Sequence, residues 1–261
     1  MKKLMLIVCT LLVSQLTKAG MVDDAVKRGT LKIGSAPIYM PFQFSDKKGQ
    51  VVGFEMDIAK EMAKAMDVKL EIVSTDYDGI IPALQTGKFD IIMSAMTVTQ
   101  KRNLQVNFAM PFIEVGQTII VRKEIADQIK TYKDLNDAKY KVTSALGTSG
   151  EATIKRVLPK ATYTSYENAQ LALLDIINGR ADALVYDSAL NEIAISKYGS
   201  DKLVHLDTKF TYEPLAWAIK KGDYDSINWL NNFLVQIKND GTYDRIYKKW
   251  FENTDWLKEV E

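Results

Sequence analysis

A short segment around Arg102 combines a buried strand, a helix start and a cation. Residues 89–102 read FDIIMSAMTVTQKR, and the apolar run at 89–93 has the length and composition of a buried strand. Thr99 is placed as an N-cap, so Arg102 falls in the first helical turn, where free backbone N–H groups favour an anion. A guanidinium there adds a second positive charge to the positive end of the helix, which is unfavourable unless an anion binds. We therefore predict a carboxylate or phosphate site at the carboxyl end of this strand.

Residues 1–19 have the pattern of a secretory signal peptide. Two lysines precede the apolar run from Leu4 to Leu16, and Ala19 stands at the expected cleavage position. The run is too short to span a bilayer comfortably, so we expect a chain exported to the periplasm. The only cysteine, Cys9, lies inside the apolar run rather than just after the cleavage point. Lipidation is therefore not expected, and disulfide chemistry has no role in the mature chain.

Charge and composition exclude several classes of partner. Lys and Arg total 34 against 33 Asp and Glu, which gives a net charge of +1. Dispersed basic residues at this balance argue against nucleic acid as a partner. The single histidine, His205, has no neighbouring cluster of Cys or His, so it is interpreted as structural, and no metal or cofactor is expected.

Strand-like runs alternate with amphipathic helical stretches, which predicts an α/β fold with mainly parallel sheets. Strands are expected at 31–35, 70–73, 89–93, 117–122, 141–144, 183–186 and 217–220. Helices are expected at 56–66, 79–85, 150–157, 168–178, 224–239 and after Gly241. The same βαβ style occurs in two blocks that meet near Gly116, so two packed lobes are predicted. The last elements lack partner strands nearby in the sequence, and a return to the first lobe would explain this.

An ordered set of motifs resembles the polar amino-acid family of periplasmic solute-binding proteins that serve ABC transporters. The matching segments are Leu31–Gly34, Pro41-Phe42, Val52–Asp57, Ile81–Leu84, Gly87–Asp90, Thr97–Arg102, Met110–Phe112, Gly147–Gly150, Gly179–Ala183, Tyr186-Asp187, Asp240–Tyr243 and Lys249–Phe251. The resemblance implies the type II periplasmic binding protein fold, with two mainly parallel sheets joined by a two-strand hinge. Lobe 1 would be residues 20–114 plus 213–261, and lobe 2 residues 115–212. A ligand between the lobes would favour their closure.

The resemblance also implies that Arg102 and Asp187 bind an amino-acid zwitterion. Arg102 can form two parallel hydrogen bonds to a carboxylate, and Asp187 would receive the α-ammonium. The ordinary alternatives are a surface arginine paired with a nearby acid and an aspartate that caps a helix. If the family roles hold, the two residues come from different lobes, and the ligand couples closure to occupancy.

Further contacts follow from the same resemblance. Ser94, Met96 and Thr97 would bind the ligand's head group, although a polar strand end that caps the next helix explains them equally well. Thr148 and Ser149 begin a helix whose free N–H groups could bind the carboxylate from the second lobe. Ordinary helix initiation is their alternative explanation.

The resemblance also implies that Tyr39 and Tyr77 flank the ligand's side chain, and both border loops at strand ends. Packing in the core is the ordinary alternative for an aromatic residue. Relatives that bind basic amino acids often have an aspartate where this chain has Ala36, and a polar glutamine is frequent at the position of Leu146. A cationic side chain buried without an acid is costly, so the sequence leans slightly toward a neutral ligand.

The expected function is a non-enzymatic receptor that delivers an amino acid to a membrane ABC permease. Its partners would be the amino acid and, transiently, the permease, with the receptor acting as a monomer. The alternative is a periplasmic enzyme on the same scaffold, of the cyclohexadienyl or arogenate dehydratase type. Such an enzyme needs a general acid, for which Glu151 and Glu213 are the candidates.

Overall fold

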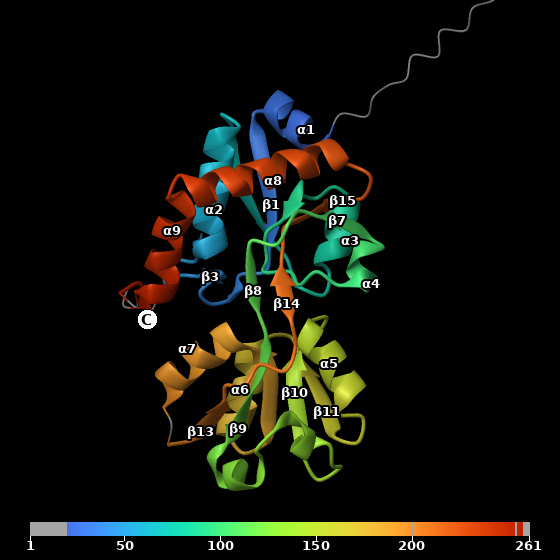
Figure 1. Cartoon of the computed structure of the whole chain (residues 1–261), viewed down its shortest axis with the longest axis vertical. Coiled ribbons are helices and arrows are strands. Elements are labelled where there is room, and N and C mark those ends of the chain that lie inside the picture. The colour runs from blue at the N-terminus through green and yellow to red at the C-terminus, as the bar shows by residue number, and fades with distance from the viewer. Residues whose placement is uncertain (1–19, 200, 254, 258–261) are drawn as a thin grey trace, which may run out of the picture.

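The computed structural model describes residues 20–199, 201–253 and 255–257 and consists of two α/β lobes, one above the other (Figure 1). The predicted signal peptide at 1–19 lies outside the described residues. Within the described ranges, no helix has both the length and the apolar character that a membrane span requires.

The upper lobe is built on a five-stranded sheet in the order β5-β1-β6-β15-β7. Its strands are β1 (Thr30–Ser35), β5 (Lys69–Ser74), β6 (Ile91–Ile92), β7 (Val106–Phe108) and β15 (Ala218–Lys220). β1 pairs in parallel with β5 and β6, whereas β15 is antiparallel to β6 and β7. Leu31 and Ile33 are fully buried because alternate side chains of β1 face the same side of the sheet.

Helices and a small sheet complete this lobe. The helices are α1 (Met21–Arg28), α2 (Phe54–Ala65), α3 (Ile80–Gln85), α4 (Gln100–Asn103), α8 (Tyr224–Asn239), α9 (Thr242–Tyr247) and the π-helical turn η3 (Lys248–Glu252). The small sheet contains β2 (Ile38–Tyr39), β3 (Gln43–Ser45) and β4 (Val51–Val52). α8 packs on α1 and β7, and α9 packs on α2. Phe251 contacts the rings of Phe42 and Phe54, so the C-terminal segment is part of this lobe's core.

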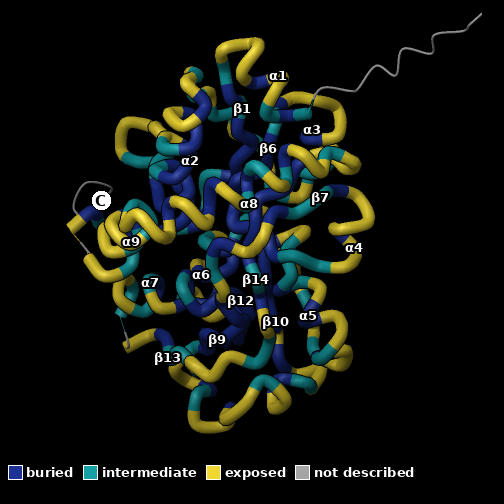
Figure 2. The backbone as a smooth tube through the Cα atoms, turned by 45° about the horizontal axis from the view of Figure 1, so that its top comes forward, coloured by how far each residue is buried: buried dark blue, intermediate teal, exposed yellow. Residues whose placement is uncertain are grey.

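The lower lobe has a second five-stranded sheet, in the order β11-β10-β12-β9-β13. Its strands are β9 (Gln117–Arg122), β10 (Lys141–Ala145), β11 (Thr162–Tyr166), β12 (Ala183–Asp187) and β13 (Leu203–Leu206). Its helices are α5 (Ser149–Val157), α6 (Ala169–Ile177) and α7 (Ser188–Tyr198), with the 3-10 turns η1 (Lys123–Gln128) and η2 (Tyr132–Leu135). Every residue of β12 is buried, and this strand lies at the centre of the lobe (Figure 2).

Two crossing strands connect the lobes. β8 (Ile113–Val115) and β14 (Glu213–Leu215) pair in antiparallel fashion and run between the two sheets (Figure 1). The predicted lobe boundaries, after 114 and before 213, fall at these two strands, and the exact division stays a prediction. A hinge at this place would let the lobes open and close about β8 and β14.

The predicted two-lobe α/β fold with mainly parallel sheets is confirmed. In each sheet one strand, β15 or β9, runs against the other four. Each reversed strand adjoins a crossing connection, because the chain enters the sheet from the other lobe at that point. Of the strand expected at 89–93, β6 covers Ile91 and Ile92, Asp90 and Met93 also donate backbone hydrogen bonds to β1, and the residues that follow form the loop that lines the interlobe cavity.

Candidate functional site

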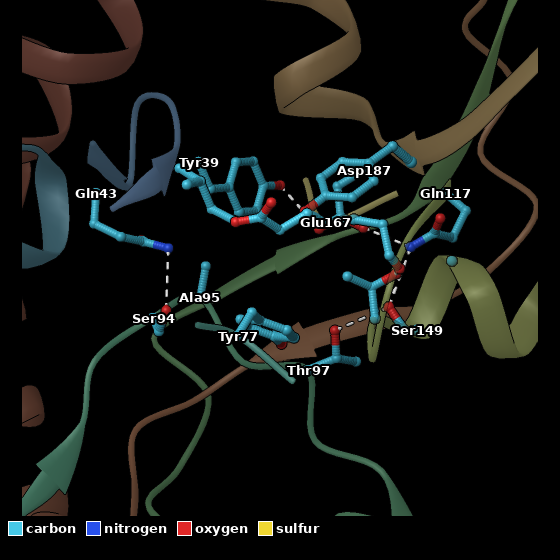
Figure 3. Close-up of a pocket in the computed structure, with 15 residues that line it drawn as sticks. Tyr39, Gln43, Tyr77, Ser94, Ala95, Thr97, Gln117, Ser149, Glu167 and Asp187 are labelled. Atoms are coloured by element: carbon cyan, nitrogen blue, oxygen red, sulfur yellow. Dashed lines mark hydrogen bonds between the residues drawn. The ribbon is translucent and has the colours of Figure 1, made fainter. Parts of the chain in front are cut away.

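A cavity lies between the lobes, and both contribute to its walls (Figure 3). Its lining residues are Ile38, Tyr39, Gln43, Tyr77, Ser94, Ala95 and Thr97 from the upper lobe, and Gln117, Ala145, Thr148, Ser149, Gly150, Glu167, Tyr186 and Asp187 from the lower lobe. Seven of the nine residues predicted from the sequence are in this set. Met96 and Arg102 are not.

Asp187 is the most unusual charged group in the cavity. It occupies the N-cap position of α7, but its side chain makes no capping hydrogen bond. Instead, its Oδ2 accepts a hydrogen bond from the Tyr39 hydroxyl at 2.9 Å, and its Oδ1 accepts one from Gln117 Nε2 at 2.6 Å. Burial raises the pKa of Asp187 to about 7, nearby Glu213 adds to this, and Tyr39 and Arg102 oppose it. A buried carboxylate of this kind is a ready partner for a cation.

Tyr39 joins the lobes through its hydroxyl group. Its ring packs against Phe42 and Tyr186 with centroid separations of 4.8 and 5.5 Å, and only 4% of the residue is exposed. Because the hydroxyl donates to Asp187 in the other lobe, Tyr39 is both a core aromatic and a polar wall of the cavity. The expectation that it borders the site and the alternative of core packing therefore both describe it.

The loop from Ser94 to Thr97 forms the upper wall. The Ser94 hydroxyl accepts hydrogen bonds from the Ala36 N–H at 3.0 Å and from Gln43 Nε2 at 3.4 Å. Ala95 has a φ of 46°, in the left-handed region that few residues other than glycine adopt. Its N–H donates to the Glu55 carboxyl group, which is completely buried in the first turn of α2. This hydrogen bond holds the loop in its uncommon conformation.

Glu55 is a buried acid whose environment opposes ionisation. Burial raises its pKa to about 8, although the hydrogen bond from Ala95 lowers it, and its Oε1 has no hydrogen-bond partner among the described residues. The raised pKa disfavours a second negative charge beside the cavity loop.

The two remaining loop residues have different surroundings. The Met96 side chain packs in an apolar cluster with Ile80, Leu84 and Phe89, and its backbone carbonyl accepts the Ala216 N–H, so its expected contact with the ligand stays a prediction for the backbone N–H. Thr97 lines the cavity, and its hydroxyl lies 3.3 Å from that of Ser149 in the other lobe.

Arg102 lies behind the cavity wall and bridges the lobes. Thr99 caps α4 as predicted, with its hydroxyl accepting the Arg102 N–H at 3.2 Å. The guanidinium donates to the Thr97 carbonyl at 2.8 Å and to the Gly147 carbonyl of the other lobe at 3.0 Å. It also lies 5.6 Å from the centre of the Tyr77 ring.

The short helix α4 contributes little to the anion site expected beside it, which stays a prediction. This helix spans only Gln100–Asn103, and one turn supplies little dipole. The positive charge of Arg102 is instead directed back toward the junction of the lobes. Any anion it holds would be bound by the guanidinium and not by the helix end.

The N-terminus of α5 forms the opposite wall. The Thr148 hydroxyl caps the helix and donates to the Ala145 carbonyl at 2.6 Å, so it is fully used within its own lobe. Ser149 faces both Thr97 and Gln117, whose Nε2 donates to its hydroxyl at 3.2 Å. The N–H groups of Ser149 and Gly150 have no intrahelical acceptor, as is general for a first helical turn. They are available to a bound carboxylate.

A side chamber continues from the main cavity past Tyr77. The two spaces share Ile38, Tyr77 and Glu167, and the chamber is completed by Ala36, Pro37, Ser74, Thr75, Asp76 and Asn168. Asp76 and Glu167 come from opposite lobes and are exposed. Among the described residues, neither carboxylate has a hydrogen-bond or ion-pair partner. The chamber therefore carries uncompensated negative charge.

Sequence reasoning missed several lining residues, chiefly Gln43, Gln117, Glu167 and Tyr186. Tyr186 could have been identified, because it precedes Asp187 at the end of a buried strand. The two glutamines and Glu167 carry no local signal, since each is an isolated polar residue whose position depends on strand pairing. Within the described chain, no group of three or more His, Cys, Asp or Glu is arranged to hold a metal ion.

Comparison with known proteins identifies the family. Residues 31–253 match the bacterial extracellular solute-binding proteins, family 3, and the chain belongs to this family. It is 32% identical over 231 residues to the "Probable histidine-binding protein" of Neisseria gonorrhoeae, which covers 84% of this chain and 82% of that protein. The predicted family, two-lobe fold and solute-binding function are therefore confirmed.

Solved structures agree with this assignment. The lysine complex of an ABC-transporter binding component from Wolinella succinogenes superimposes with a TM-score of 0.85 at 49% identity, covering 88% of this chain and 99% of that one. An ancestral amino acid-binding protein, described as a precursor of cyclohexadienyl dehydratase, gives a TM-score of 0.84 at 49% identity, covering 89% of this chain and 100% of that one.

Proposed function

We propose that this protein captures a free amino acid between its lobes and delivers it to an ABC permease at the membrane. The observation that carries the proposal is Asp187, a buried carboxylate in the cavity wall that serves no helix cap. An α-ammonium group would supply the missing positive charge. The amino-acid ligands of the lysine-bound and histidine-binding relatives support this chemistry.

The ligand's carboxylate would lie toward the opposite side of the cavity. We infer that it binds the free N–H groups of Ser149 and Gly150 and the guanidinium of Arg102, which has five donors in all. Because Arg102 belongs to the upper lobe and Asp187 to the lower one, a zwitterion would link them. Ser94 and Thr97 would add contacts from the upper wall. Ligand binding would thus stabilise the closed arrangement over the open one.

A binding panel tests this function. Purified mature protein should show a raised thermal midpoint with one chemical class of amino acid, and calorimetry should give one ligand per chain, recovered unchanged. The corresponding amides and deaminated acids should bind much more weakly. If no amino acid raises the midpoint or gives a binding isotherm, the proposed function is wrong.

We further propose that the preferred ligand is a cationic amino acid. A long side chain that leaves the Asp187 end of the cavity past Tyr77 would enter the chamber between Asp76 and Glu167, whose charges would attract its cation. This proposal replaces the slight lean toward a neutral ligand. Ala36 lines the same chamber. The aspartate that relatives often have at this position is therefore replaced by two other acids, Asp76 and Glu167.

The Glu167→Gln substitution should reduce lysine affinity by about 3- to 10-fold, because a partly solvated charge pair is lost. Norleucine, which lacks the terminal ammonium, should bind this variant and the unmodified protein equally well. Titration calorimetry with both ligands measures the difference. The matched control is Glu192→Gln, an exposed acid of the same lobe that does not line either space. Equal affinity of the unmodified protein for lysine and norleucine would contradict the cationic assignment.

Amino-acid affinity should fall as the pH decreases below about 7. The ammonium pairs with ionised Asp187, whose pKa in the ligand-free protein is about 7. Below that pH the carboxyl group must first lose its proton, so affinity should drop by up to about tenfold per pH unit and be constant above pH 7. Calorimetry with lysine, whose charges do not change in this range, checks the profile. A flat profile across the range would contradict the pairing of the ammonium with Asp187.

We propose that the protein is a receptor and not an enzyme. Burial opposes ionisation of Glu151, but hydrogen bonds from Lys155 and the Gly147 N–H lower its pKa, which suits a poor general acid. Glu213 lies on the crossing strand β14 and does not line the main cavity. Incubation with prephenate or arogenate should therefore give no product. We also propose a periplasmic, non-lipidated monomer that meets its permease transiently.

A further inference from the structure

Gln117 occupies a junction between the hinge and the cavity. It is the first residue of β9, directly after the crossing strand β8 and Gly116, and it lies opposite Asp187 in the antiparallel pairing of β9 with β12. Only 1% of the residue is exposed, and its side chain points into the group formed by Asp187 and Ser149 (Figure 3). The Gln117 amide can therefore contact residues of the cavity wall, while its backbone lies next to the hinge.

Its amide nitrogen makes two hydrogen bonds, and its oxygen makes none. Nε2 donates to Asp187 Oδ1 at 2.6 Å and to Ser149 Oγ at 3.2 Å. Oε1 is buried without a partner among the described residues, against the α-carbon side of Gly150. The reverse orientation would set two oxygen acceptors against each other at Asp187. The amide is therefore held in place by its donors, although this leaves a polar atom unsatisfied.

This arrangement would be unfavourable for packing alone. A buried polar atom without a partner lowers stability, and an apolar side chain of similar size would avoid that loss. The compensating gain is the hydrogen bond from Nε2 to a charged acceptor, which is stronger than a bond between neutral groups. The same nitrogen also reaches the first turn of α5, where the ligand's carboxylate is proposed to bind. Gln117 thus connects the two ends of the binding site in the lower lobe.

We propose that Gln117 is a positioning residue for amino-acid recognition, which fixes the Asp187 carboxylate and the Ser149 hydroxyl in one arrangement that matches the ammonium and the carboxylate of the ligand. This inference rests on the proposed amino-acid function. Because Gln117 is the first residue of β9, it also connects Asp187, the proposed ammonium-binding acid, to the crossing strand β8 of the hinge.

The Gln117→Met variant, which keeps the side-chain volume but removes the donor, tests the proposal. Lysine affinity at pH 7.5 should fall about 10- to 100-fold, the range expected when a hydrogen bond to a charged group is lost. The pH below which affinity falls should move upward, because ionised Asp187 loses one stabilising donor. The same change at Gln170, whose amide donates to the Ile38 carbonyl and not to Asp187, should leave that pH unchanged.

A second comparison keeps the test valid if the methionine variant is unstable. In an Asp187→Asn background, the Gln117→Leu substitution should lower affinity by a smaller factor than Gln117→Leu does alone, because only its effect through Ser149 remains. Thermal unfolding of each ligand-free variant shows that it is folded. An unmoved pH profile in Gln117→Met, or fully additive losses in the double variant, would overturn the positioning role. A failure of the unmodified protein to bind any amino acid would instead contradict the proposed function itself.

Discussion

Replacing Asp187 with asparagine is expected to weaken amino-acid binding about 100-fold or more. Removal of one partner of a buried, hydrogen-bonded charge pair leaves the other charge without compensation, and here that charge is the α-ammonium of the ligand. The asparagine keeps the size of the side chain, so the cavity keeps its shape. Titration calorimetry with lysine at pH 7.5 gives the loss, and the remaining weak binding should no longer depend on pH between about 5 and 8.

The same variant should be more stable than the unmodified protein when no ligand is bound. The folded-state pKa of Asp187, about 7, is above the unfolded value of 3.8, so stability is lost as the pH rises between these values. Asparagine removes that loss, and its thermal midpoint at neutral pH should be higher. The matched control is Asp182→Asn, an equally buried acid of the same lobe that pairs with Arg122 and does not line the cavity. Undiminished lysine affinity in Asp187→Asn would refute the assignment of the ammonium site.

Replacing Arg102 with methionine should also reduce affinity about 100-fold, for two reasons that can be separated. The variant loses the proposed partner of the ligand's carboxylate, and it loses the hydrogen bond from the upper lobe to the Gly147 carbonyl of the lower lobe. Lysinamide, which has no carboxylate, distinguishes them. If Arg102 binds the carboxylate, lysine should lose far more affinity than lysinamide does.

The control for this comparison is Arg122→Met, which removes a guanidinium from an ion pair of the lower lobe. It should leave the ratio of lysine to lysinamide affinity as it is in the unmodified protein. Equal losses for both ligands in Arg102→Met would show that Arg102 only holds the lobes together. In that case the free N–H groups at the start of α5 would be the main carboxylate site.

Much of the fold could be predicted because its signals are local. Apolar runs of strand length and helical periodicity placed β1, α2, β9 and α8 close to their observed bounds. Thr99 was recognisable as a cap from its position alone. Strand direction was not predictable in this way, because an isolated strand has the same pattern in parallel and antiparallel pairs. The reversed strands β9 and β15 depend on how the chain crosses between the lobes.

Some residues of the cavity could likewise be predicted from the sequence, and others could not. The residues at strand ends and helix starts, such as Ser94, Ser149 and Asp187, were predicted from the family resemblance, and their places agree with the general position of ligand sites in α/β proteins. The bend at Ala95 turns the Met96 side chain into the core, so any contact of Met96 with the ligand has to come from its backbone, and that contact stays a prediction. Glu167 was missed because it reaches the cavity only when α6 is placed opposite the first loop of the other lobe.

The amino-acid sequence by itself determined the class of fold and the family, since each depends on residue types in a given order, and the resemblance to that family predicted Arg102 and Asp187 as the charged pair for a zwitterion. Tertiary structure decided the raised pKa of Asp187, its donors Tyr39 and Gln117, and the acidic side chamber. The reason is physical. A pKa, a hydrogen bond between lobes and the charge of a cavity all depend on distances and burial among residues far apart in the chain, and only the folded molecule sets these.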